Sequence, residues 1–183
     1  MRVIVGVTGA SGSLYAAQLI GRLAANPEVE EVALIVTDNG AAVCEHEGIT
    51  LPVSSKIRRA DNHSMFDAVA SGSAAYDAMA IIPCSMGTLG RIASGVSMDL
   101  VGRAADVMLK ERRRVVICPR ETPLSLIHIQ NMERLTLAGA VILPCSPSLY
   151  SHPQTIDEMC ATVVERVVAQ MGIREPHYEW SGK

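Results

Sequence analysis

The chain is poor in aromatic residues and contains no long apolar run. One phenylalanine, four tyrosines and one tryptophan occur among 183 residues, although 49% of the residues are hydrophobic. The core must therefore be packed mainly with aliphatic side chains. No apolar run approaches the ~20 residues that a membrane-spanning helix requires, so we predict no membrane span. Mean hydropathy is nonetheless above zero, which is consistent with apolar surface buried between subunits.

Several functional signatures are also missing. No two cysteines have CxxC spacing, and the first residues follow a strand pattern and not a signal-peptide pattern, which favours a reducing cytoplasm. No basic stripe with interleaved aromatics is present, so a nucleic-acid-binding module is set aside. The absence of a GxGxxG motif argues against a nicotinamide-dependent dehydrogenase. The five cysteines are Cys44, Cys84, Cys118, Cys145 and Cys160.

Aliphatic runs bounded by turn residues predict a parallel sheet that is buried on both faces. Two early runs occupy residues 2–7 and 32–36. Three later runs each end in proline and two further residues, and these endings are Pro83-Cys84-Ser85, Pro119-Arg120-Glu121 and Pro144-Cys145-Ser146. The loops after the strands should gather at the carboxyl edge of the sheet, where open α/β proteins bind their ligands.

Helical patterns separate these runs. They cover residues 14–25, a short stretch from Thr37 towards Glu47, residues 89–110 with a break near Gly95, residues 123–137 with Thr122 as N-cap, and residues 155–171 with a capping box. Residues 49–75 are polar and show little periodicity. We interpret them as a long excursion with short elements, such as a lid or an inter-subunit arm.

The stretch 103–123 concentrates positive charge in a chain whose formal net charge is −3. Six of the sixteen lysines and arginines fall there, namely Arg103, Lys110, Arg112, Arg113, Arg114 and Arg120. This excess predicts an anion site, although Arg112, Arg113 and Arg114 are also explained as a solvated helix end. Arg120 and Glu121 follow a strand and form either a structural ion pair or a phosphate site in which Glu121 supplies a proton.

Other loop residues also have two readings. The turn at residues 8–13 brings backbone N–H groups to a phosphate or flavin, or is a tight turn with a serine N-cap. The same alternatives hold for Ser85 to Thr88. Tyr150 is a ligand contact or a loop anchor, and Arg166, off the apolar stripe of its helix, is by itself a solvated charge. His128 is expected in a core or an interface.

Five motifs show that the sequence resembles the UbiX/Pad flavin prenyltransferases, within the wider group of flavin-containing cysteine decarboxylase-like proteins. They are TGASG (residues 8–12), PCSMGTL (83–89), RAADVMLKERR (103–113), PRETPLSLIHIQNM (119–132) and GAVILP (139–144). The resemblance covers residues 1–173, which we predict to be one flavin-binding domain followed by a tail at residues 174–183.

The resemblance implies a three-layer αβα subunit, flavodoxin-like or Rossmann-like, in a cytoplasmic homododecamer with FMN at a subunit interface. It also implies a metal-independent transferase. Dimethylallyl monophosphate alkylates reduced FMN at N5, and a second bond to C6 closes a ring. The prenylated FMN serves a UbiD-type decarboxylase in ubiquinone biosynthesis or in aromatic acid decarboxylation.

Site residues follow from the resemblance by position. Those expected to bind flavin are Gly9, Ala10, Ser11, Thr37, Ser85, Met86, Gly87, Thr88 and Arg120. Those expected to act in catalysis are Ser11, near N5 for proton transfer, Glu47, from a neighbouring surface, Arg103, Lys110 and Glu121. Those expected to bind the prenyl phosphate are Arg103, Lys110, Arg120, Glu121, Tyr150 and Arg166.

Three positions depart from the family pattern. Asp38 and Gly87 stand where many members have lysine, and the sequence Tyr150-Ser151-His152-Pro153 is closer to the branch associated with aromatic-acid decarboxylases. These departures leave open a monophosphate or a diphosphate donor. Two alternatives remain, an FMN-dependent cysteine-type decarboxylase and a non-catalytic FMN-binding protein. The first is expected to have a catalytic histidine in its N-terminal half, and here no histidine precedes His46.

Overall fold

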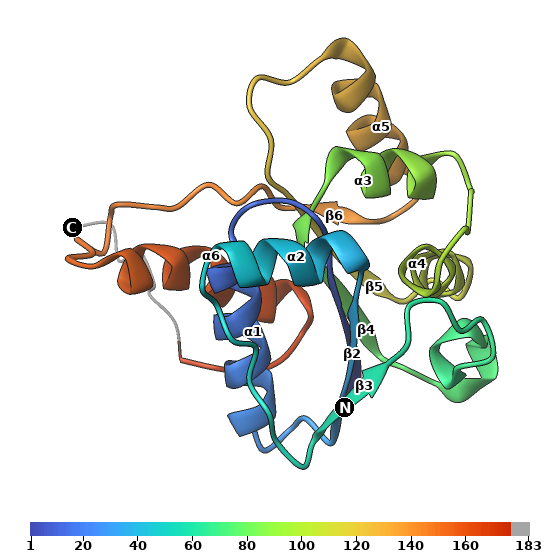
Figure 1. The fold of residues 1–183 in the computed structure, drawn as a ribbon, viewed down its shortest axis with the longest axis horizontal. Helices are drawn as coiled ribbons and strands as arrows, with labels where there is room; N and C mark the ends of the chain where they lie inside the picture. Colours follow the sequence, from blue (N-terminus) through green and yellow to red (C-terminus); the bar gives the residue numbers. More distant parts are fainter. Residues whose placement is uncertain (177–183) are drawn as a thin grey trace.

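The computed structural model describes residues 1–176, which form a six-stranded sheet between two layers of helices (Figure 1). All neighbouring strands are parallel, in the order β3-β2-β1-β4-β5-β6. The strands are β1 Arg2–Val7, β2 Glu31–Val36, β3 Ile57–Ala60, β4 Ala78–Cys84, β5 Arg114–Pro119 and β6 Val141–Ile142. The predicted three-layer parallel fold is confirmed, and the chain reverses its direction of travel across the sheet between β1 and β4.

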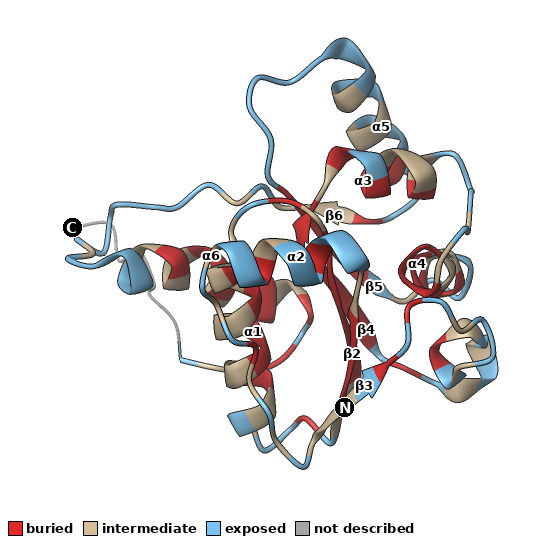
Figure 2. Cartoon of the chain, in the orientation of Figure 1, coloured by how far each residue is buried: buried red, intermediate tan, exposed pale blue. Residues whose placement is uncertain are grey.

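The two helical layers follow from the alternation of side chains along the strands. Val3, Val5 and Val7 of β1 pack in one cluster with α1 and α6, whereas Ile4 packs in the other with α4. Figure 2 shows the buried residues along the sheet and the inner helix faces. The helices of the first layer are α1 Ser13–Ala25, α2 Asp38–His46 and α6 Ile156–Gln170, and those of the second are α3 Met86–Ala93, α4 Leu100–Lys110 and α5 Leu126–Leu137.

Four sequence-based predictions need correction. The helix predicted from Pro123 begins instead at Leu126, because Ser125 accepts a hydrogen bond from the His128 N–H and donates its own N–H to His128 Nδ1 (both 3.3 Å). His128 is thus a capping residue that is only half-buried, so the core position is wrong and the interface position stays a prediction. The strand predicted from residue 141 ends at Ile142. Ile156, assigned to the apolar stripe of α6, is 72% exposed.

The polar excursion at residues 49–75 contains an edge strand that its sequence concealed. Strand β3 pairs with β2, and the two short 3-10 helices Ala68–Ala70 and Gly72–Ala74 follow it. Arg58 of β3 pairs with Asp67 (2.7 Å) and with Glu31 of β2 (3.0 Å). These ion pairs fix the excursion to the sheet.

Two further points concern the extent of the chain. Of the tail predicted at residues 174–183, residues 177–183 lie outside the described residues, and the division into a domain and a tail stays a prediction. Among the helices of residues 1–176, none combines the length and apolar character needed to cross a membrane.

Candidate active site

A hollow of about 540 Å³ opens at the carboxyl edge of the sheet, beside the loops that follow β1, β2 and β4. This is the switch point of the sheet, where α/β proteins of this topology bind ligands. Five of the residues predicted to bind flavin line it, namely Gly9, Thr37, Ser85, Gly87 and Thr88. The remaining ones lie beside it: Ala10 and Met86 are buried, and Ser11 is exposed and accepts a hydrogen bond from Arg120 Nε (3.2 Å) on its carbonyl.

The β1 loop is held tightly against the loops that follow β2 and β4. A Cβ at Gly9 would lie 2.5 Å from Cβ of Asn39, so no other residue fits there without a shift of the backbone. The buried hydroxyl of Thr8 donates to the Pro83 carbonyl (2.9 Å) and accepts from the Ser85 N–H (2.8 Å). Thr8 therefore joins two of the loops of the hollow, a role that the sequence did not indicate.

The N-terminus of α1 is capped by Glu47 and not by a serine. Gly12 is the N-cap residue in a left-handed conformation, and it has no side chain that could cap the helix. The Glu47 carboxylate accepts hydrogen bonds from the Gly12 N–H (2.9 Å) and the Ser13 N–H (2.7 Å). The serine-capped turn is therefore the wrong alternative for α1. Within this chain, the Glu47 side chain lies beside the β1 loop and contacts Ser11.

The environment of Glu47 favours its ionised form. Burial alone would raise its pKa, but hydrogen bonds from the Ser11 hydroxyl and from the Gly12 and Ser13 N–H groups outweigh burial and hold the pKa below the ordinary 4.5. A carboxylate at this position is also stabilised by the helix dipole. The Ser11 hydroxyl therefore has an ionised carboxylate as its hydrogen-bond partner.

The stability that Glu47 contributes should depend on pH. Because its folded pKa is lowered, the contribution is complete above pH 4.5 and is lost as the pH falls through the folded pKa. We expect Glu47→Gln to lower the free energy of unfolding at neutral pH by about 1 kcal/mol, and the difference from wild type to shrink in acid. Urea unfolding of both proteins, at neutral pH and in acid, measures this difference. The exposed Glu45→Gln serves as control, and a constant difference across the pH range would contradict the assignment.

The N-terminus of α3 is the part of the hollow best suited to an anion. Ser85 caps it, since the Ser85 oxygen accepts from the Thr88 N–H (3.3 Å), which confirms the capping alternative for this serine. Helix α2 carries Asp38 in its first turn and α4 is capped by Asp99, whereas α3 has no acidic residue in its first turn. The helix dipole of α3 is therefore not offset by a local carboxylate.

Arg91, which the sequence analysis missed, supplies a cation at this helix N-terminus. Its guanidinium donates to the Thr88 hydroxyl (3.1 Å), pairs with Asp99 (3.5 Å) and lies 3.7 Å from the position of a Cβ at Gly87. The sequence spacing could have identified Arg91, because a residue four positions after Gly87 lies on the same face of the helix. The other missed lining residues are Asn39, Asn62, His63, Met98 and Asp99.

The residues predicted to bind the prenyl phosphate are not assembled by one chain. Lys110 ends α4 and contacts Glu111 near the amino end of β5, whereas Glu121 follows the carboxyl end of β5. A six-residue strand is about 20 Å long, so the two groups lie at opposite edges of the sheet. Arg103 pairs with Asp106 (2.7 Å).

Arg120 and Glu121 form hydrogen bonds with different partners. Arg120 donates to the Ser11 carbonyl, and Glu121 accepts from the Thr122 N–H (3.0 Å). Within residues 1–176 the two side chains form no ion pair with each other, so the structural alternative for them is not observed. Tyr150 and Arg166 are both exposed.

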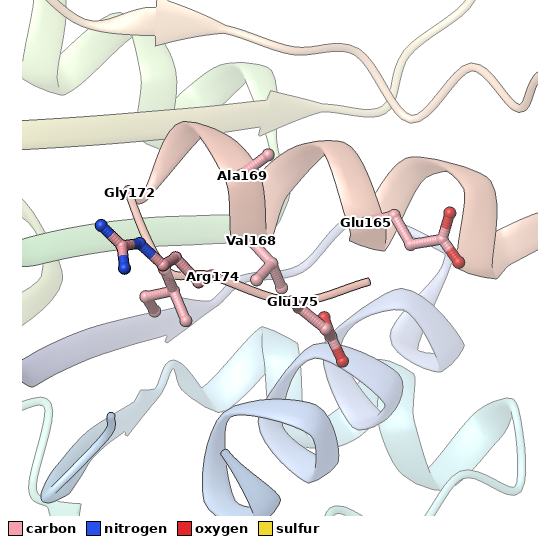
Figure 3. A pocket seen from close by; sticks show the side chains of 7 residues that line it. Glu165, Val168, Ala169, Gly172, Arg174 and Glu175 are labelled. Carbon is pink, nitrogen blue, oxygen red and sulfur yellow. The ribbon is translucent and has the colours of Figure 1, made fainter. Parts of the chain in front are cut away.

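A second hollow lies at the opposite edge of the sheet, at the end of α6. It measures about 330 Å³, and Figure 3 shows the side chains around it, among them Glu165, Arg174 and Glu175. Arg22 of α1 pairs with both glutamates (3.3 and 3.4 Å). None of the predicted site residues lines this hollow. The hollow at the switch point is therefore the candidate active site.

Comparisons with known proteins show the family of the chain. A model of the family described as Flavoprotein matches residues 1–171. A probable UbiX-like flavin prenyltransferase from Streptomyces sp. (strain D7) is 40% identical over 186 residues, with 100% of this chain and 92% of the relative covered.

Two solved structures have the same fold over nearly the whole chain. One is a dodecameric FMN-dependent UbiX-like decarboxylase from Escherichia coli O157:H7, with a TM-score of 0.91, 39% identity and 100% of both chains covered. The other is AnUbiX (PadA1) in complex with FMN and dimethylallyl pyrophosphate, with a TM-score of 0.87, 35% identity and 98% of both chains covered. The chain therefore belongs to the Flavoprotein family, among its UbiX-like flavin prenyltransferases.

Proposed function

We propose that this protein transfers a dimethylallyl group from dimethylallyl monophosphate to N5 and C6 of reduced FMN, giving prenylated FMN. The observation that carries the proposal is the hollow at the switch point, where the Gly9 turn meets the N-terminus of α3. Relatives about 40% identical over the full chain are named as flavin prenyltransferases. A related structure was solved with FMN and a dimethylallyl donor bound.

The residues of the hollow fit FMN. Its volume of about 540 Å³ lies in the usual range for small-molecule sites. At Gly9 the absence of a side chain lets the β1 turn pack closely against Asn39 of α2 at the wall of the hollow. Ser85 to Thr88, with Arg91, would hold the phosphate at the N-terminus of α3. Bound here, reduced FMN supplies the nucleophilic N5.

The chemistry assigned to the protein side chains is the departure of phosphate and the movement of protons. As the donor's C–O bond breaks and its carbon bonds to N5, Lys110, Arg103 and Arg166 neutralise the leaving dianion. Glu121 supplies a proton to the phosphate, and Tyr150 hydrogen-bonds it. Ser11, paired with Glu47, moves the proton that N5 releases. Ring closure releases no net proton, because the proton that C6 loses as it bonds to the second carbon is balanced by the proton that the neighbouring carbon of the dimethylallyl double bond gains.

Such a set requires more than one chain, so we propose a homo-oligomer with sites at its subunit interfaces. The relative from E. coli O157:H7 is dodecameric, and we propose the same assembly here. Apolar side chains of α5 support a subunit contact, since Leu126, Ile127 and Leu137 are 67%, 67% and 81% exposed. In Figure 1 this helix and the loop before it extend away from the sheet.

Shared sites predict that two inactive variants restore activity to each other. Lys110→Ala and Glu121→Gln proteins should each be nearly inactive alone. Oligomers coexpressed from both genes should recover about a quarter of the wild-type activity, because that fraction of sites receives both wild-type residues. Turnover of tagged and purified mixed oligomers measures this. Mixed oligomers as inactive as either parent would show that one chain supplies both groups.

The proposed reaction also predicts the release of inorganic phosphate. Protein given reduced FMN and dimethylallyl monophosphate without oxygen should release one phosphate per flavin consumed. Dimethylallyl diphosphate in a parallel reaction decides the donor, since it would release pyrophosphate instead. Omission of FMN is the control, and phosphate release that does not need the flavin would identify a phosphatase.

The place of the product in the cell is part of the proposal. We propose a cytoplasmic protein that passes prenylated FMN to a UbiD-type decarboxylase. The recipient acts in ubiquinone biosynthesis or in the breakdown of aromatic acids.

A further inference from the structure

The rim of the FMN hollow carries an unusual balance of charge for a site that binds a phosphate. Two carboxylates, Asp38 and Asp99, and one arginine, Arg91, line it together with His63. Arg91 pairs with Asp99 (3.5 Å), so these two charges offset each other. Asp38 is left facing His63, whose Nε2 lies 3.1 Å from its carboxylate oxygen. The net charge of the rim therefore depends on whether His63 is protonated.

The position of His63 is fixed by its neighbour. Asn62 is buried, its carbonyl accepts from the Leu100 N–H (2.9 Å), and its side-chain oxygen accepts from the Val101 N–H (3.2 Å). These bonds tie the segment to the first turn of α4. Asp38 is the first residue of α2, which Thr37 caps. The pair thus links two elements that are separately anchored, and it lies between the hollow and a smaller one of about 260 Å³ that both residues also line.

We propose that His63 controls the affinity of the site for the flavin phosphate by cancelling the charge of Asp38. When His63 is protonated, the rim is neutral and accepts the phosphate of FMN. When His63 is neutral, the Asp38 carboxylate repels that phosphate. The affinity for riboflavin, which has no phosphate, does not depend on the protonation of His63. The inference rests on the proposed function and adds to it a residue that selects for the phosphorylated flavin.

Several charged groups surround His63. Its hydrogen bond to Asp38 raises its pKa above the ordinary 6.5, and the charges of Asp38, of Asp61 on its own segment and of Asp99 at the start of α4 act in the same direction. Arg91 of α3 lines the hollow and Arg59 of β3 lines the smaller one, and both oppose protonation. His63 therefore keeps its proton to a higher pH than a free histidine, and FMN affinity should fall as the pH rises through the pKa of His63.

The test compares wild type with His63→Gln by flavin fluorescence titration of the purified oligomer with FMN and with riboflavin, at about pH 6 and about pH 8.5. We expect His63→Gln to bind FMN about three- to fivefold more weakly than wild type at the lower pH and equally well at the higher pH. Asp38→Asn should bind FMN more tightly than wild type at the higher pH. His46→Gln, at the other end of α2, is the matched control and should behave as wild type.

Comparison of variants at the same pH removes the contribution of the FMN phosphate, which itself titrates near pH 6. An equal FMN affinity for His63→Gln and wild type at both pH values would overturn the inference. An equal loss of riboflavin affinity would also overturn it, because His63 would then support the ring site and not the phosphate. These results leave the proposed function standing. Failure of wild type to bind FMN at all would refute the proposed function and this inference together.

Discussion

A Gly9→Ala protein is expected to bind FMN about ten- to hundredfold more weakly than wild type. The new Cβ would lie 2.5 Å from Cβ of Asn39, which belongs to the first turn of α2 and has little freedom to move. Relief of such a contact costs about 1–3 kcal/mol and moves the turn out of the position in which it faces the hollow. Titration of the purified protein with FMN measures the loss, and thermal unfolding measures the cost to the fold.

The matched control places the same substitution in α1. At Gly21 a Cβ would meet only Pro52, at 3.8 Å, so Gly21→Ala should keep its FMN affinity and gain slightly in stability from the better helix former. Wild-type affinity in Gly9→Ala would show that the flavin does not lie against the β1 turn.

Replacement of Glu121 by glutamine should slow turnover by about a hundredfold or more, because a general acid typically contributes ~10²–10⁴ to a rate. Glutamine has nearly the same shape as glutamate but has no proton to give to the departing phosphate. Glu121 is exposed and lines no part of the FMN hollow, so FMN affinity should be unchanged. Single-turnover measurements with saturating donor separate the chemical step from binding.

The control for this variant is Glu133→Gln, an exposed glutamate on α5 that has no assigned role. It should retain full activity. Unchanged turnover in Glu121→Gln would remove Glu121 from the mechanism. A loss of FMN affinity that accounts for the whole defect would place it in the flavin site instead.

The sheet could be predicted because its central strands are buried on both faces and so read as continuous aliphatic runs. Strand β3 could not, because an edge strand has one open side, and Arg58 and Arg59 break the apolar pattern there. The start of α5 was placed too early for a different reason. Proline at position 123 suits a first helical turn, but the side-chain bonds of Ser125 and His128 decide the boundary.

The candidate site was predicted where its residues follow strands directly, as Gly9, Thr37 and Ser85 do. Its other members come from outside those loops. Arg91 lies one helical turn beyond Gly87, and Asn62 and His63 come from the excursion that had no clear periodicity. Glu47 was assigned by resemblance alone, and its contact with the α1 N-terminus depends on tertiary packing.

The charged stretch at residues 103–123 shows a further limit. Its sequence places Lys110 and Glu121 eleven positions apart, and both are expected at the prenyl phosphate. The intervening strand separates them instead, so a phosphate site that uses both must join different chains. The sequence pattern of one chain does not show which subunit supplies each side chain of a shared site.

The mass of the flavin after reaction tests the central proposal most directly. Purified protein, reduced FMN and dimethylallyl monophosphate are incubated without oxygen. The flavin is then extracted, and its mass is measured by mass spectrometry. We predict a flavin heavier by one dimethylallyl group. Only unmodified FMN with both the monophosphate and the diphosphate, or carbon dioxide released from an aromatic acid while the flavin stays unmodified, would contradict the assignment as a flavin prenyltransferase.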